Sequence, residues 1–202
     1  MKVKKKKQKE FDVKEQYEKC FAFLKESKIF IYSIVVLFFA FVLIGFFVPA
    51  PESVIEMIKK FIEELLKQTQ GMSFSELTGF IIMNNLQTSF FGMIFGIVFG
   101  IFPLLLAMSN GYLLGFVSKL SVQTDGFLSL WKLLPHGIFE LPAVFISLGL
   151  GMKIGSFIFQ KKGKKIKSLK EYSLNSLKVF FFVVIPLLII AGIIEGALMF
   201  LL

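Results

Sequence analysis

The stretch IFIYSIVVLFFAFVLIGFFV, residues 29–48, contains twenty residues and no charge. An α-helix of that length is about 30 Å long, which matches the hydrocarbon thickness of a bilayer. The whole chain of 202 residues is 55% hydrophobic and has a mean hydropathy of +0.76. The stretch therefore predicts the first transmembrane helix of an integral membrane protein.

A cleaved signal peptide is the competing interpretation of this region. Val48-Pro49-Ala50 loosely resembles the small-residue site at which signal peptides are cut. However, the apolar run is too long for a signal-peptide core, and the polar segment that precedes it is oversized. We therefore expect a retained membrane anchor.

Four further spans follow from the remaining apolar sequence. The block from Phe80 to Leu120 is too long for one crossing, and Pro103 divides it, because proline fits the first turn of a helix and not its interior. We expect these spans at about residues 78–101, 103–120, 135–159 and 179–202, with Pro186 kinking the last.

Two shorter helices are predicted between the spans. Residues 52–70 alternate apolar and charged side chains at helical spacing, which indicates an outer amphipathic helix started by a capping box at Ser53 and Glu56. A second capping box at Ser73 and Glu76 starts the next helix, and residues 121–134 form a short interfacial segment. The predicted fold class is an all-α polytopic membrane protein, with five transmembrane helices, an outer amphipathic helix and a short interfacial helix.

The charges set the predicted topology. All 23 basic residues are lysine, and the segments 1–28 and 153–178 hold eighteen of them, which by the positive-inside rule belong in the cytoplasm. The predicted organisation is a cytoplasmic lysine-rich segment, 1–28, followed by a transmembrane domain, 29–202, with the outer helix 52–70 and a cytoplasmic basic loop 160–172. We expect a multi-pass protein of the cell membrane with its N-terminus in the cytoplasm and its C-terminus outside.

The same charges bear on partners. A net charge of +9 without any arginine argues against nucleic-acid recognition, which favours the guanidinium group. Lysine-rich segments beside membrane helices instead attract anionic lipid. The single cysteine, Cys20, excludes an intramolecular disulfide and a thiolate metal site.

Polar residues within the predicted spans mark the candidate site. His136 and Glu140 share one face of the fourth span, because residues four apart lie on the same side of a helix. Ionisable groups in hydrocarbon are costly and need partners or a function. By the predicted topology the candidates lie in the outer half of the membrane, with Asn110 near the midplane; they are His136, Glu140, Glu195, Asn84, Asn85 and Asn110.

Small residues at four-residue spacing predict where the helices approach closely. The expected packing positions are Gly92, Gly96, Gly100, Gly111, Gly115, Gly137 and Gly151, and we expect the stripes that they form to face one another.

Three functions are compatible with these residues. The first is an outer-facing polar cavity that binds or passes a small ligand, a proton or a lipid headgroup, within a larger membrane complex or as a transport protein. The second is a structural scaffold in which the polar cluster holds the helices together. The third is an intramembrane metal-assisted hydrolase, but Ser147 lies about three turns from His136, too far to be its direct partner. We expect that this protein is not an enzyme.

Metal or cofactor binding has little support in the sequence. His136, Glu140 and Glu195 are weak metal candidates, because one histidine and two carboxylates make only a partial ligand set. We expect neither a metal nor a cofactor.

Several short motifs resemble the stage II sporulation protein M family. They are Asn84-Asn85-Leu86, Asn110-Gly111, the run PHGIFE at 135–140, and Ile194-Glu195, and the resemblance covers about residues 29–202. It implies a five-helix integral membrane protein; in spore-forming bacteria the namesake belongs to a membrane complex with peptidoglycan-degrading partners during engulfment. The resemblance therefore implies that this chain assembles with other membrane proteins or with copies of itself. The residues that carry over are Asn84, Asn85, Asn110, Gly111, His136, Gly137, Glu140 and Glu195.

Overall fold

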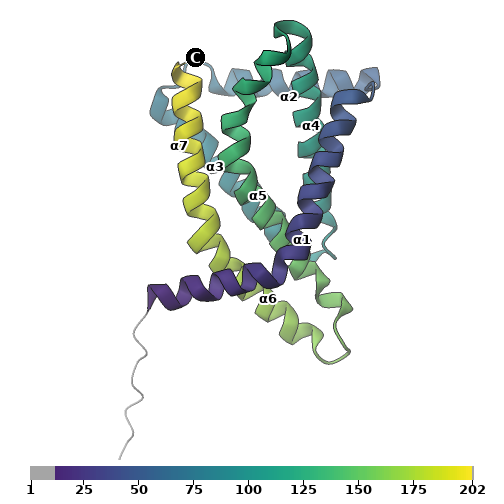
Figure 1. Ribbon diagram of the computed structural model, residues 1–202, viewed down its shortest axis with the longest axis vertical. Coiled ribbons are helices and arrows are strands. Elements are labelled where there is room, and N and C mark those ends of the chain that lie inside the picture. Colours follow the sequence, from purple (N-terminus) through teal and green to yellow (C-terminus); the bar gives the residue numbers. More distant parts are fainter. Residues whose placement is uncertain (1–11, 202) are drawn as a thin grey trace, which may run out of the picture.

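The computed structural model describes residues 12–201, except for the side chains of residues 131–137, 139 and 199–201. All the regular secondary structure in this part of the chain is helical. Five helices in this part of the chain are long and apolar enough to cross a membrane. They stand side by side as a bundle (Figure 1). The predicted all-α polytopic fold is thus confirmed.

The crossing helices come in the predicted order with shifted boundaries. They are α1 (Val13–Phe47), α3 (Phe74–Ile94) with η1 (Phe95–Ile97), α4 (Ile101–Asp125), α5 (Leu134–Gly155) with η3 (Ser156–Phe159), and α6 (Lys165–Val179) with η4 (Phe180–Val184) and α7 (Ile185–Leu201). Two further elements lie between them, α2 (Glu52–Thr69) and η2 (Phe127–Leu133). Because α6 begins at Lys165, only the first part of the predicted basic loop is a loop.

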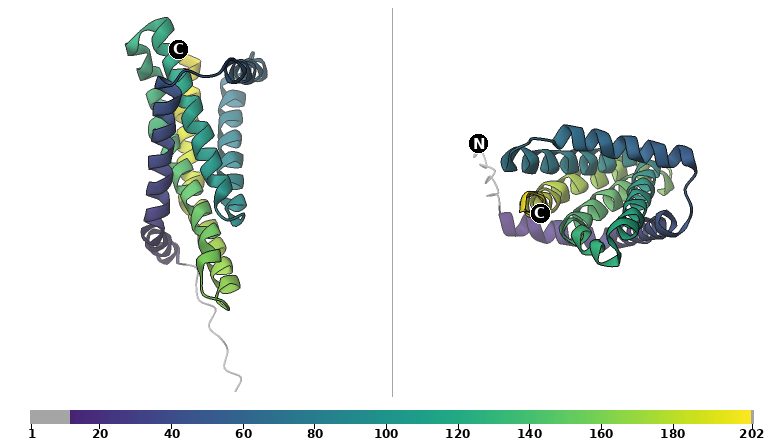
Figure 2. Two further views of the ribbon diagram at one scale, coloured as in Figure 1. Left: turned by 90° about the vertical axis from the view of Figure 1, so that its right-hand side faces the viewer. Right: turned by 90° about the horizontal axis from the view of Figure 1, so that it is seen from above.

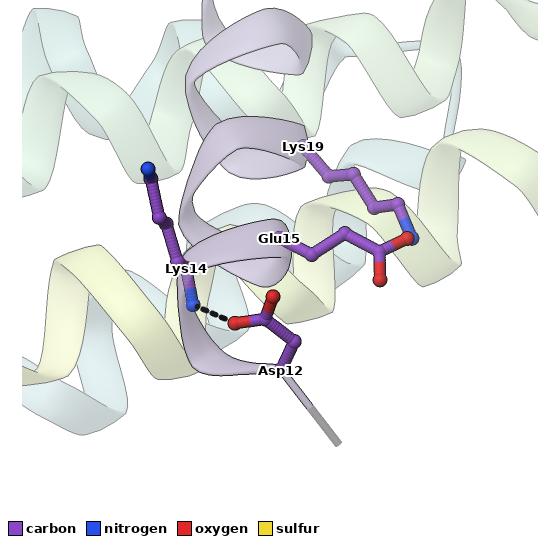
Figure 3. A network of polar contacts seen from close by, with 4 residues as sticks. All are labelled: Asp12, Lys14, Glu15 and Lys19. Atoms are coloured by element: carbon purple, nitrogen blue, oxygen red, sulfur yellow. Dashed lines mark hydrogen bonds and ion pairs between the residues drawn. The ribbon is translucent and has the colours of Figure 1, made fainter. Parts of the chain in front are cut away.

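Helix α1 begins well before its apolar run. The Asp12 carboxylate accepts a hydrogen bond from the backbone N–H of Lys14 at 2.9 Å, and Lys19 pairs with Glu15 at 2.7 Å (Figure 3). A side-chain oxygen at the N-cap satisfies one of the free N–H groups of the first turn. The purple N-terminal part of α1 lies across the lower end of the bundle, and the rest runs along the bundle (Figure 1).

Helix α2 lies across the opposite end of the bundle, where the C-terminus also lies (Figures 1 and 2). The predicted capping box at Ser53 is wrong, because Pro51 takes the N-cap position and its carbonyl accepts the N–H groups of Val54 and Ile55. The second box is confirmed: the Glu76 carboxylate accepts from the Ser73 backbone N–H at 2.8 Å and from its hydroxyl at 2.7 Å.

The division of the long apolar block at Pro103 is also confirmed. Pro103 is buried in the first turn of α4, where its missing N–H costs nothing. The chain reverses just before it through Phe99 and Gly100, whose φ angles are +55° and +72°. Glycine adopts this left-handed backbone without strain.

The glycine stripe of α4 packs on a different helix from the one expected. Gly111 and Gly115 lie against the backbone carbonyls of Phe38 and Val42, so this face of α4 packs on α1 and not on the other glycine stripes. Phe38 is buried, and its ring centroid lies 5.1 Å from that of Phe145 on α5. In contrast, Gly96 of η1, which continues α3, lies against the backbone of Gly151 on α5.

The Lys153 side chain contacts two neighbouring helices near the end of the bundle that carries the loop between α5 and α6. The Lys153 ammonium lies 5.5 Å from the ring centroid of Phe30 and 4.7 Å from that of Tyr172. Such contacts between a cation and aromatic faces are attractive. They connect α5 with α1 and α6.

We predict that Gly96→Ala destabilises the protein, because the new methyl group would overlap the carbonyl of Gly151, and backbone atoms cannot move aside cheaply. The apparent Tm in detergent should fall by about 3–10 °C. Gly79→Ala on the same helix is the matched control, since nothing lies within 4 Å of its added methyl. Equal melting of both variants would contradict the close packing of α3 and α5.

Candidate functional site

Helices α3, α5 and α7 form the interface at which most of the candidate residues meet. Gly92 lies against Leu148 and Gly96 against Gly151, so α3 and α5 run in the same direction. Thr78 and Ile82 of α3 lie against two glycines of α7, which runs the opposite way; these glycines are Gly196 and Gly192. These four contacts fix the relative heights of the three helices.

The helical register places Asn85 and Glu140 at the same depth. Seven or eight residues before the contact of Gly92 with Leu148, the paired positions are Asn85 on α3 and Glu140 on α5. Glu195 lies beside Gly196 and is therefore level with the first turns of α3. At 1.5 Å per residue, Glu195 is about 9 Å nearer to the end of the bundle that carries α2.

Two of the candidate side chains are buried where these helices meet. Glu140 is 8% exposed and Asn85 is 9% exposed, whereas Glu195 is partly buried. Asn84 is exposed, and its side-chain amide donates to the Asn85 side-chain oxygen at 3.5 Å. Of the adjacent asparagines, Asn85 is therefore the one that faces the interface.

Three hydroxyl groups at this interface were not predicted as site residues. Ser89 on α3 and Ser147 on α5 are fully buried, and within the described residues their hydroxyls have no hydrogen-bond partner. The same is true of the buried hydroxyl of Thr78 on α3. The sequence did carry a signal, because Ser89 follows Asn85 by four residues and Ser147 follows Glu140 by seven, which keeps each on its neighbour's helix face.

The predicted pairing of His136 with Glu140 lies outside the described residues. The backbone of His136 is in the first turns of α5, but its side chain is not described. The same holds for the surroundings of Gly137. The register nevertheless puts the His136 backbone close to the level of Glu195 on α7.

Asn110 lies on a fourth helix, one turn deeper. Leu106 of α4 packs against Gly92, and Asn110 follows Leu106 by four residues, so both are on the side of α4 that faces α3. Asn110 is partly buried and level with Thr88. No hydrogen bond within the described part of the chain joins its side chain to the other candidates.

An apolar layer closes the interface toward the end of the bundle that carries the loop between α5 and α6. Met93, Leu150 and Val184 are fully buried, and Ile154 is 1% exposed. These side chains belong to one packed cluster directly below the polar residues. The polar part is thus confined to the half of the interface nearer α2 and the C-terminus.

Metal chemistry finds no support in the described residues. Among them no three histidine, cysteine, aspartate or glutamate side chains lie together as ligands. Of the weak metal candidates, the side chains of Glu140 and Glu195 are among the described residues, whereas the His136 imidazole is not.

Comparison with known proteins agrees with the fold. The family described as Stage II sporulation protein M matches residues 34–198. Two proteins of Methanocaldococcus jannaschii are similar: Uncharacterized protein MJ0706 is 31% identical over 178 residues, covering 86% of this chain and 79% of the relative, and Uncharacterized protein MJ0793 is 31% identical over 118 residues, covering 57% and 66%. No solved structure matches the chain. With the family match spanning the last four of its five membrane-crossing helices and the first from Ile34 onward, the chain belongs to the stage II sporulation protein M family.

Proposed function

We propose that the interface of α3, α5 and α7 is an outer-facing site that binds a proton or a small polar ligand within the membrane. The observation that carries this proposal is the burial of Glu140 and Asn85 at one depth, beside two serine hydroxyls that have no partner in the described part of the chain. Buried polar groups are costly unless they are satisfied by protein, water or ligand. A water or a ligand at this interface would satisfy the hydroxyls of Ser89 and Ser147.

The groups present suit a small polar guest. A carboxyl group accepts hydrogen bonds when ionised and also donates one when protonated, and an amide offers both functions. A proton, a water molecule or a small cation matches a site with one deeply buried carboxyl group.

The apolar layer supports binding over free passage. Met93, Leu150 and Val184 are fully buried below the site, so a polar guest would meet tightly packed hydrocarbon on its way inward. Passage across the membrane would require these helices to separate.

The orientation follows from the lysines and belongs to the same proposal. Residues 12–28 and the loop between α5 and α6 lie at one end of the bundle, whereas α2 and the C-terminus lie at the other (Figure 1). Positive residues favour the cytoplasmic side. We place the lysine-rich end in the cytoplasm and the polar site in the outer half of the cell membrane.

A structural scaffold is the second candidate, and the glycine contacts favour it. Gly96 and Gly115 bring helix backbones together without any help from polar side chains. The two candidate functions differ in the role of the buried hydroxyl groups. In a scaffold they hold the helices together, whereas in a binding site they form hydrogen bonds to the ligand.

We predict that the buried Glu140 side chain reacts with dicyclohexylcarbodiimide, an apolar reagent that attacks carboxyl groups inside membranes. Peptide mass spectrometry of the detergent-purified protein should find the adduct on Glu140. Exposed carboxylates of α2, such as Glu56 and Glu64, should remain unmodified and serve as internal controls. Labelling of α2 without labelling of Glu140 at any pH would contradict an accessible carboxyl site.

Replacing the hydroxyls separates the site from the scaffold. Ser89→Ala and Ser147→Ala remove groups without hydrogen bonds in the described structure, so the apparent Tm of the ligand-free protein should stay within about 3 °C of the wild type or rise. A loss of more than about 5 °C in both variants would assign the hydroxyls to helix association and favour the scaffold.

The orientation is tested with single cysteines in a Cys20→Ala background. Gln70→Cys and Lys162→Cys change exposed residues at opposite ends of the bundle. A membrane-impermeant maleimide on intact cells should label position 70 and should reach position 162 only after the membrane is permeabilised. The reverse pattern would overturn the proposed topology.

A further inference from the structure

We propose that the bend in α1 is a binding site for an anionic phospholipid, with the phosphate held by Lys25 and Lys28 and an acyl chain in the groove beside them. A groove of about 710 Å³ lies at this bend. Its lining runs along α1 from Glu18 to Tyr32 and ends on Ile146 of α5. This site is separate from the polar interface of α3, α5 and α7.

The shape of α1 produces the groove. Its first part lies across the inner end of the bundle and its second part runs along the bundle, so the lining residues come from both arms of one bent helix (Figure 1). The Ser33 hydroxyl donates to the carbonyl of Ile29 at 2.8 Å, just after the first arm. Serine bonds of this kind to the preceding turn bend helices.

The lysines give the groove its charge. Lys25 and Lys28 are three residues apart, so their ammonium groups share one face of the helix. Both are exposed, and neither forms an ion pair in the described part of the chain. Glu18 is the single acidic residue of the lining, which leaves the groove with a net positive charge.

The rest of the lining is apolar and open. Phe21 is 61% exposed and Tyr32 is 63% exposed, and Ile31 and Ile146 continue the wall along the bundle. Large exposed apolar side chains beside lysines match the two ends of a phospholipid, since the lysines lie at the level of the headgroups and the wall extends into the hydrocarbon. The cytoplasmic leaflet is rich in anionic lipid, which fits the charge of this end of the bundle.

The test compares lipid binding by matched lysine variants of the full-length protein. Lys25→Gln/Lys28→Gln removes the proposed phosphate contacts, and Lys161→Gln/Lys162→Gln removes the same charge from the exposed loop between α5 and α6 at the same end of the bundle. Native mass spectrometry of detergent-purified protein titrated with dioleoyl-phosphatidylglycerol gives the affinity, and dioleoyl-phosphatidylcholine reports binding without net charge.

We expect the groove variant to bind phosphatidylglycerol about tenfold or more weakly, since each lysine near an anionic surface contributes about fivefold. The loop variant should change binding less than about twofold, and Ile146→Trp should also weaken it by filling the groove. Equal losses in the two lysine variants would show diffuse attraction and overturn the proposal, as would unchanged binding in Lys25→Gln/Lys28→Gln. Circular dichroism and lipid-free melts establish that all variants are folded.

Discussion

The contact between the backbones of α3 and α5 at Gly96 and Gly151 is the constraint on which the rest of this structure depends. Two helices approach this closely only where neither carries a side chain, and in a membrane such packing replaces the hydrophobic driving force that is absent between helices. The contact fixes the register of α3 against α5. That register in turn places Asn85 at the depth of Glu140, with the buried Met93 and Leu150 on the side toward the loop between α5 and α6.

The bundle consists of two packed units. Helices α1 and α4 pack through Gly111 and Gly115, and the aromatic contact between Phe38 and Phe145 attaches this pair to α5. Apart from Asn110 of α4, the candidate polar residues lie in the other unit, α3, α5 and α7.

The sequence predicted what depends on local patterns. Hydropathy and length predicted five spans, because each crossing needs about twenty apolar residues, and Pro103 located the reversal because proline fits the first turn of a helix better than its interior. The helix faces of Asn85 and Glu140 also follow from spacing alone. Whether those faces meet at one depth could not be predicted, since register depends on close contacts between distant residues.

Other features of the fold were beyond local patterns for the same reason. The capping box at Ser53 is complete in the sequence, but Pro51 supplies the carbonyl that the helix uses. The partner of Gly111 and Gly115 could not be read from their spacing, because any helix surface accepts such a stripe. Likewise, nothing local shows that residues 13–28, which precede the apolar run, are part of α1.

The central claim is that Asn85 and Glu140 belong to one site, and a double-mutant cycle tests it most directly. Unfolding free energies in mixed micelles would be measured for Asn85→Ala, Glu140→Gln and the double variant, with Gln87→Ala on the exposed face of α3 in place of Asn85→Ala as the control pair. Residues that share one polar site are coupled by about 0.5–3 kcal/mol. A coupling in that range, absent from the control pair, is the predicted result; additive effects within about 0.3 kcal/mol would contradict a shared site.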